Sequence, residues 1–274
     1  MEARNVVLLL AAAVSLGLAD GSAQGGGGSV FRPLLADPKE PQFFASYLWD
    51  HSPRLSSKLA TVGVGQTIGL VREPNWELAI AAGVFSQFNM QSATNDLINT
   101  DYLVGLPFTY RHGSWATRFR LYHQSSHLGD EYLLHTNAQR VDLTFEAAEL
   151  LVSKEMANWR VYGGGEYLFA HSPADLAPGV LHGGLEYRQP EALVRLGRFA
   201  AGRLVVGLDA RSVQDRQWQV GWSLVTGLEL ADPAASSAGW RWSVLLKAYT
   251  GPSPYGEFYR DGVASVGLGL GFTL

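Results

Sequence analysis

From about residue 43 to the C-terminus, apolar side chains recur at every second position in nearly every segment of the chain. In WRVYGGGEYLF, residues 159–169, one alternate set is apolar and the other includes Arg160, Tyr162 and Glu166. Because successive side chains of a strand point to opposite faces, this period indicates strands rather than helices. The chain is therefore predicted to be all-β.

About twelve such segments follow one another. They begin near residues 43, 58, 75, 101, 115, 137, 158, 180, 202, 217, 239 and 262. Short connections such as REPN and RHGS alternate with longer polar ones such as SQFNMQSATNDLINT. An even number of strands joined by short turns at one end and long loops at the other is typical of a transmembrane antiparallel β-barrel.

Tryptophans distinguish this barrel from a soluble one, which also alternates. Trp76, Trp115, Trp159 and Trp240 each stand at the start of an outward-running segment, on its apolar face. Tryptophans at one depth form the interfacial girdle of an outer-membrane barrel. The opposite face is too rich in charge for a dry core and is assigned to a polar lumen. Its charged residues are Arg118, Arg120, Asp142, Glu146, Arg160, Glu166, Glu186, Arg188, Asp209 and Arg211.

The N-terminus has the pattern of a cleavable signal peptide over residues 1–23, with an apolar run from Val6 to Leu18 that is too short to span a bilayer as a helix. Residues 24–40 are predicted to be a glycine-rich tether, and residues 41–274 the barrel. The C-terminal GLGLGFTL is similar to the terminal strand by which the barrel-insertion machinery recognises its substrates. The predicted location is the outer membrane of a Gram-negative bacterium.

Composition excludes several classes of partner and site. The formal net charge is −4, from 25 acidic and 21 basic residues spread along the chain, so no basic stripe favours nucleic acid. There is no cysteine, which excludes a lipoprotein anchor, disulfides and cysteine-based metal sites. The expected partner is membrane lipid of the outer leaflet.

One segment breaks the apolar pattern of the outer face. In TRFRLYHQSSHL, residues 117–128, the apolar odd-numbered set continues through His123, Ser125 and His127, so these side chains are predicted to project towards lipid. The next strand is predicted to run through Asn137 to Phe145 with its odd-numbered face also outward. Asn137 would then lie opposite His123 and Ser125.

A serine needs an adjacent base to act as a nucleophile, and that base needs a third group to fix its tautomer. Ser125 is therefore the candidate nucleophile, His123 the candidate base and Asn137 the orienting residue. The reaction would be hydrolysis of a lipid acyl ester, because lipid alone meets that face. His127, which also stands two residues from Ser125, is an alternative base.

His123, Ser125 and Asn137 resemble the His-x-Ser arrangement with a later asparagine in outer-membrane phospholipase A, a twelve-stranded barrel whose catalytic serine and histidine face lipid. Lipid A deacylase has a similar His-x-Ser pair with a later glutamate. The phospholipase pattern continues with Asn-Gly, where this chain has Ser126 and His127. Over most of its length the chain resembles an uncharacterised family of bacterial outer-membrane barrels, through FRPLLADPKEPQF, YHQSSHLGDEYL, VYGGGEYL, HGGLEYR and GPSPYGEFYR.

Two alternatives remain open at this point. Polar residues at the end of a strand also occur wherever a barrel leaves the hydrocarbon, and this needs no catalysis, so the alternative is a non-enzymatic barrel, either a narrow pore or a surface-binding scaffold. Calcium is the candidate cofactor, and Asp130 and Glu131 are its weak candidate ligands. Two adjacent carboxylates make no complete oxygen shell, and loop solvation is the simpler interpretation.

Overall fold

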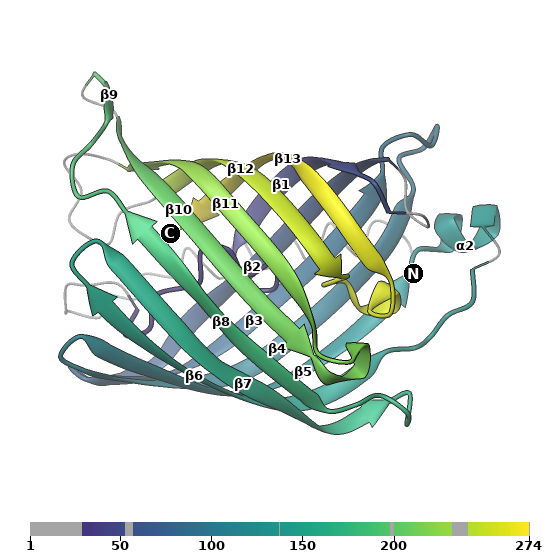
Figure 1. The fold of residues 1–274 in the computed structure, drawn as a ribbon, viewed down its shortest axis with the longest axis horizontal. Helices are drawn as coiled ribbons and strands as arrows, with labels where there is room; N and C mark the ends of the chain where they lie inside the picture. Colours follow the sequence, from purple (N-terminus) through teal and green to yellow (C-terminus); the bar gives the residue numbers. More distant parts are fainter. Residues whose placement is uncertain (1–28, 53–56, 137, 198–199, 232–240, 274) are drawn as a thin grey trace.

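The computed structural model describes residues 29–52, 57–136, 138–197, 200–231 and 241–273. The signal peptide predicted for residues 1–23 lies outside these residues. In the described part, antiparallel strands close into a barrel (Figure 1). Its strands are β1 (Phe43–Asp50), β2 (Lys58–Arg72), β3 (Trp76–Asn89), β4 (Leu97–His112), β5 (Trp115–Leu128), β6 (Thr144–Met156), β7 (Trp159–Ser172), β8 (Gly179–Arg188), β10 (Ala200–Val213), β11 (Gln219–Ala231), β12 (Arg241–Pro252) and β13 (Gly262–Thr273).

Each strand pairs with the next along the chain, and β13 pairs with β1 to close the barrel. A short additional strand, β9 (Val194–Leu196), pairs with the start of β10. Closure gives each of the twelve barrel strands two neighbours, so the barrel itself has no open edge, as a barrel in hydrocarbon requires. The predicted all-β, twelve-stranded barrel is confirmed. Among the described residues, no helix is long and apolar enough to cross a membrane.

Most strands begin close to the predicted positions, with two exceptions. The fourth begins at Leu97 rather than near residue 101, and the sixth begins at Thr144 rather than near 137. Part of the expected loop before β6 forms the helix α2 (Asp130–Thr136) instead. This short helix has Asp130 and Glu131 in its first turn and His135 in its last, an arrangement that suits the helix dipole.

The inner and outer faces follow the predicted alternation on β5. Phe119 and Leu121 are 43% and 45% exposed on the outside, whereas Arg118 and Arg120 are buried inside. The prediction is wrong for β6, where the residues facing inward are odd-numbered and include the buried Phe145. Glu146, assigned to the lumen, therefore faces outward, because residues 138–143 are irregular and break the phase of the alternation.

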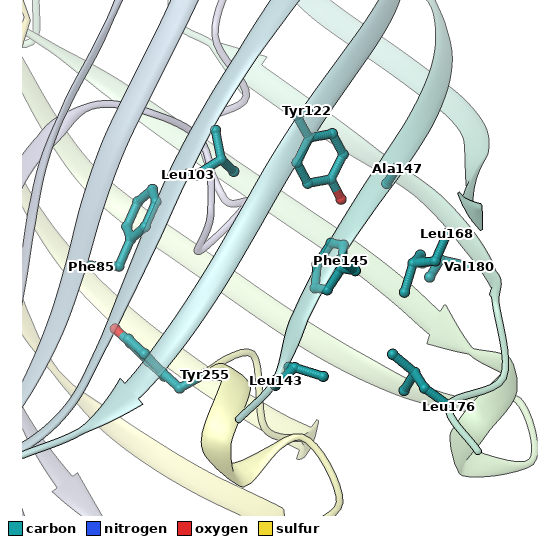
Figure 2. Close-up of a cluster of buried hydrophobic side chains, with 10 residues drawn as sticks. All are labelled: Phe85, Leu103, Tyr122, Leu143, Phe145, Ala147, Leu168, Leu176, Val180 and Tyr255. Carbon is teal, nitrogen blue, oxygen red and sulfur yellow. The ribbon is translucent and has the colours of Figure 1, made fainter. Parts of the chain in front are cut away.

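Two further assignments around this break are corrected. Asp142 lies before β6, with a left-handed φ of 54°, and is exposed rather than lumenal. Leu143, predicted to face lipid, is buried among the interior side chains drawn in Figure 2. Both errors have the same origin, since shifting a strand by one residue exchanges its two faces.

The aromatic girdle lies at the short-turn end. Trp76, Trp115 and Trp159 begin β3, β5 and β7, as predicted. Trp240 lies outside the described residues, and Trp242 is the exposed tryptophan near the start of β12. Other aromatic rings of this end pack on the tryptophans. The pairs are Trp76 with Phe108, Trp159 with Tyr187 and Trp242 with Phe272, at centroid distances of 5.7, 4.9 and 4.7 Å.

The N-terminal segment lies inside the lumen. From residue 29 to 42 it runs without regular structure through the barrel interior, where the trace before β1 is visible in Figure 1. Leu34 is fully buried, and Glu40 pairs with Arg118 at 2.8 Å. Lys39 pairs with Asp101 of β4. The described part of the expected tether, residues 29–40, is thus packed inside the barrel, and we call residues 29–42 the plug.

The loop between β12 and β13 closes the long-loop end from inside. Its short helix η2 (Gly256–Phe258) is buried, and the Gly256 backbone N–H donates to both carboxylate oxygens of Asp101 at 3.3 and 3.1 Å. Tyr255 joins Phe85 and Phe145 in the largest interior apolar cluster (Figure 2). Together with the plug, this loop occupies much of the barrel interior and leaves separate cavities between the plug and the wall.

Candidate lipid-facing active site

The long-loop half of β5 places three polar residues on the outer surface. His123 and Ser125 are partly exposed and His127 is exposed, while the intervening Gln124 and Ser126 are buried inside. The alternation predicted for this segment therefore agrees with its burial. The apolar outer surface continues below them on the same strand through Leu121 and Phe119.

Glu146 completes this outer group, and sequence reasoning missed it. The register places Glu146 directly opposite His123 across β5 and β6. His123 Nδ1 lies 3.0 Å from Glu146 Oε1, with 42% and 45% of the two side chains exposed. Glu146 could have been found by placing the start of the sixth strand at Thr144. With that start, residue 146 becomes the cross-strand neighbour of residue 123.

The contact suits one tautomer of His123. With the ring proton on Nδ1, that nitrogen donates to Glu146 Oε1, and the Nε2 lone pair is available to accept a proton. This is the relation that an orienting carboxylate has to the base of a serine hydrolase. It also compensates an acidic side chain that would otherwise stand alone on an apolar surface.

Ser125 stands two residues from His123 on the same face. Among the described residues, no hydrogen bond joins the Ser125 hydroxyl to the His123 ring. Catalytic contacts of this kind are often long in the absence of substrate and shorten when it binds.

Asn137 lies outside the described residues, so its role as orienting residue stays a prediction. It precedes β6 rather than belonging to it, since that strand begins at Thr144. The residue opposite Ser125 is Thr144, whose hydroxyl donates to the backbone oxygen of Gln124 at 3.2 Å. Position 144 thus has the cross-strand place that was assigned to residue 137.

The remaining polar candidates have other contacts. His127 packs on the ring of Tyr102 at a centroid distance of 5.9 Å, and Tyr102 is the residue opposite Ser125 on β4. Asp130 forms an ion pair with Arg140 at 3.0 Å. Within the described residues, the clusters that could hold a metal ion include neither Asp130 nor Glu131.

A second histidine–carboxylate pair joins α2 to the loop between β3 and β4, next to this surface. His135 of α2 lies with Nδ1 2.7 Å from Asp96 Oδ2, in the loop between β3 and β4. Hydrogen bonds from the Thr94 hydroxyl and from His135 lower the pKa of Asp96 below its ordinary value. Asp96 thus remains ionised and holds the helix against the neighbouring loop.

Comparison with known families decides the relationship of this chain. The profile of the family described as "Protein of unknown function (DUF1207)" matches residues 2–274. The chain belongs to the DUF1207 family. No curated protein matches it. The family-level resemblance inferred from the sequence is therefore confirmed, and it extends over nearly the whole chain.

Solved structures similar to this DUF1207 protein are outer-membrane barrels. Outer membrane phospholipase A from Escherichia coli has 14% identity and a TM-score of 0.59, with 88% of this chain and 93% of that chain covered. The Salmonella typhi outer membrane phospholipase, described as a dimer with bound calcium, has 14% identity and a TM-score of 0.58, with 85% and 92% covered. LpxR from Salmonella typhimurium has 11% identity and a TM-score of 0.43, with 84% and 99% covered. At such identities the first two matches show the fold alone.

Proposed function

We propose that this DUF1207 protein is an outer-membrane hydrolase that cleaves an acyl ester of phospholipid or lipid A in the outer leaflet. The observation that carries the proposal is the His123–Glu146 pair on the outer wall, with Ser125 two residues away on the same face. A nucleophile, a base and an orienting carboxylate are the parts that serine-dependent ester hydrolysis requires.

The position of the pair favours chemistry over simple solvation. Two ionisable side chains on the lipid-facing side of a barrel wall cost free energy that a pair of apolar residues would not. Loop solvation needs no specific histidine–carboxylate contact. The 3.0 Å contact instead fixes the imidazole and directs its second nitrogen away from Glu146.

The proposed reaction follows from these three groups. His123 Nε2 takes the proton of the Ser125 hydroxyl while the serine oxygen attacks the ester carbonyl carbon, and the alcohol of the lipid leaves with that proton. Water then attacks the acyl-serine with His123 again as base, which releases the fatty acid and restores Ser125. Glu146 stabilises the charged imidazole in both steps.

The likeness to outer membrane phospholipase A supports the substrate class. That protein is named for phospholipid cleavage, and its barrel covers most of this chain. Together with the outward position of Ser125, this favours lipid in the outer leaflet and a location in the outer membrane. Assembly by the barrel-insertion machinery remains a prediction, carried by the terminal strand β13.

The plug inside the lumen argues against the alternative of a narrow pore. The plug and the buried η2 helix occupy the interior, and Glu40, Lys39 and Asp101 anchor them through buried ion pairs and hydrogen bonds. A surface-binding scaffold without enzymatic activity is the outcome that the following experiment would reveal.

The test compares fatty-acid release from phospholipid and from lipid A by purified protein in mixed micelles, with and without calcium. We expect release by the native chain and its loss in Ser125→Ala and His123→Ala. The matched control is Ser86→Ala, which removes another outward-facing serine, on β3. Equal release by all four proteins, or none from the native chain, would refute the hydrolase.

Two further variants separate the orienting residues. Glu146→Gln keeps the shape of the side chain and removes its charge, so we expect a drop in kcat of roughly 10²- to 10⁴-fold if Glu146 orients His123. Asn137→Ala should leave kcat within about threefold in that case. The reverse result would assign the role to Asn137, as the sequence pattern suggests.

A further inference from the structure

A buried cluster lies inside the barrel wall, on the face opposite to the lipid. Glu149 of β6, Glu166 of β7 and His182 of β8 each place one potential ligand atom within 4.8 Å of the others. Their residues are 0%, 6% and 4% exposed. Glu149 and Glu166 are also direct cross-strand partners. Like charges in that position destabilise a sheet unless positive charge lies between or beside them.

His182 is oriented as a metal ligand would be. Its Nε2 lies 2.7 Å from Asp209 Oδ2, and the Tyr162 hydroxyl donates to the same oxygen at 2.5 Å. With the imidazole proton on Nε2, that nitrogen donates to Asp209 Oδ2 and the lone pair lies on Nδ1. Metal-binding histidines are held in this way by a carboxylate behind them.

One imidazole nitrogen of His182 and one carboxylate oxygen of Glu166 face each other. His182 Nδ1 and Glu166 Oε1 are 3.9 Å apart, and neither atom has a hydrogen-bond partner among the described residues. That distance is too long for a hydrogen bond, so a shared proton does not explain it. An ion bound about 2.1 Å from each atom spans a separation of up to about 4.2 Å.

The neighbouring groups leave these atoms available. The other oxygen of Glu166 accepts hydrogen bonds from Tyr122 and Arg211, at 2.5 and 2.7 Å. Gly164 is the cross-strand partner of His182 and lies so close to β6 that an added Cβ would meet the Leu150 backbone oxygen at 1.9 Å. The GGGE stretch singled out by its glycines therefore lies beside this cluster.

We propose that His182 Nδ1, Glu166 Oε1 and the Glu149 carboxylate bind one divalent first-row transition-metal ion, for which Zn²⁺ is the probe. One imidazole and two carboxylates form a donor set suited to such ions. Both oxygens of Glu149 accept hydrogen bonds from Arg118 or Arg120. Its Oε1 accepts one of them, from Arg118 Nε, and keeps a lone pair for the ion. A bound ion lies between the facing carboxylates and ties β6, β7 and β8 together from inside the barrel.

A second grouping, Asp37, His182 and Asp209, is less suited to an ion. It would use the Nε2 atom that already contacts Asp209. Asp37 comes from the plug rather than from the wall. The proposed site therefore lies on the other side of the His182 ring, between three adjacent strands.

The experiment measures metal content after refolding. The full chain is unfolded in urea with chelator, refolded in detergent micelles with Zn²⁺ or Co²⁺, desalted and analysed by elemental mass spectrometry. We expect about one ion per native chain and loss of binding in His182→Gln and Glu166→Gln. The control His171→Gln, which changes a histidine at the end of β7 with Nδ1 3.1 Å from the Pro173 backbone oxygen, should keep the ion.

Two other readouts keep the proposal testable when a variant fails to refold. Bound Co²⁺ should give the visible absorption of nitrogen and oxygen ligands, and added Zn²⁺ should raise the unfolding temperature of the native chain. A native chain that retains no ion and shows no shift would overturn the site, as would equal retention in His182→Gln. Ser125→Ala should bind the ion normally, because the barrel wall separates the two sites.

Discussion

The plug is predicted to be held largely by one buried guanidinium. Arg118 donates from Nη1 to both oxygens of Glu40, at 2.8 and 3.0 Å, and from Nε and Nη2 to Glu149, at 2.8 and 3.3 Å. Arg118→Met keeps most of the side-chain volume and leaves two buried carboxylates without this partner. Glu149 retains Arg120 at 2.6 Å, whereas Glu40 has no second cation within ion-pair distance among the described residues.

Removing one partner of a buried ion pair costs about 3–5 kcal/mol, mainly through the charge left behind. Because Arg120 still compensates Glu149, we expect Arg118→Met to lower the free energy of unfolding by about 3 kcal/mol. Adding Glu40→Gln removes the orphaned charge, so the double variant should be more stable than the sum of the single effects. The expected coupling is about 1–3 kcal/mol.

The assay is equilibrium urea unfolding in lipid vesicles, followed by tryptophan fluorescence and by the mobility shift of folded barrels in gels. Arg120→Met is the matched control, because Arg120 contacts Glu149 but no residue of the plug in the described ion pairs. Its cycle with Glu40→Gln should be additive within about 0.5 kcal/mol. Additivity in the Arg118 cycle as well would refute the idea that this pair anchors the plug.

Three other predictions concern the Asp96–His135 pair, the two faces of the barrel wall and the plug. Because the pKa of Asp96 is lowered, its pair with His135 contributes its full stability above the ordinary Asp pKa, about pH 4, and loses it as the pH falls through the lowered pKa. The difference in unfolding free energy between the native and Asp96→Asn proteins should therefore shrink as the pH falls. A difference that stays constant with pH would contradict this prediction. A cysteine at Phe119 should react with membrane-soluble but not water-soluble maleimides, whereas one at Leu134, 80% exposed on α2, should react with both; the opposite pattern would invert the faces. Deletion of residues 29–40 should give stepwise conductance in planar bilayers that the intact chain lacks, and equal conductance by both would show that the plug does not close the lumen.

The strand positions were predictable because local chemistry specifies them. Alternation gives each strand its face, and turns such as RHGS between β4 and β5 end one strand and begin the next with an outward tryptophan, Trp115. In a barrel that is apolar outside and charged inside, the inward positions of Arg118 and Arg120 follow from parity alone. These features need no long-range information.

The segment before β6 shows where that reasoning ends. Its residues alternate in polarity, but they form the helix α2 and an irregular stretch, and β6 resumes in the other phase. Nothing local marks the change, so parity carried through it assigned Leu143 outward and Glu146 inward. Adding Glu146 to the polar outer group required the pairing register between β5 and β6, which cannot be read from the sequence alone.

The plug was unpredictable for a different reason. Residues 29–42 have no strand or helix period, and Pro33 and Pro38 suit an irregular chain. Their partners are distant in sequence: Glu40 lies 78 residues from Arg118, and Leu35 lies 151 residues from Glu186, whose carboxylate accepts its backbone N–H. A glycine-rich stretch next to a barrel is therefore predicted to be a tether, unless the charged lumen residues that bind the segment after it are known.

The two faces of the wall handle charge in opposite ways, and the contrast bears on function. Inside, acidic and basic side chains are close enough to neutralise one another, and an ionisable residue there needs no function beyond packing. Outside, the apolar surface offers no such compensation, and His123 with Glu146 forms the ionisable pair that meets it among the described ion pairs. If the pair served stability alone, replacing both residues by leucine should destabilise the barrel. If the pair is costly, the same replacement should stabilise the barrel, as apolar replacement of costly ion pairs often does. A gain in stability with loss of fatty-acid release would mean that the outer pair is retained for catalysis.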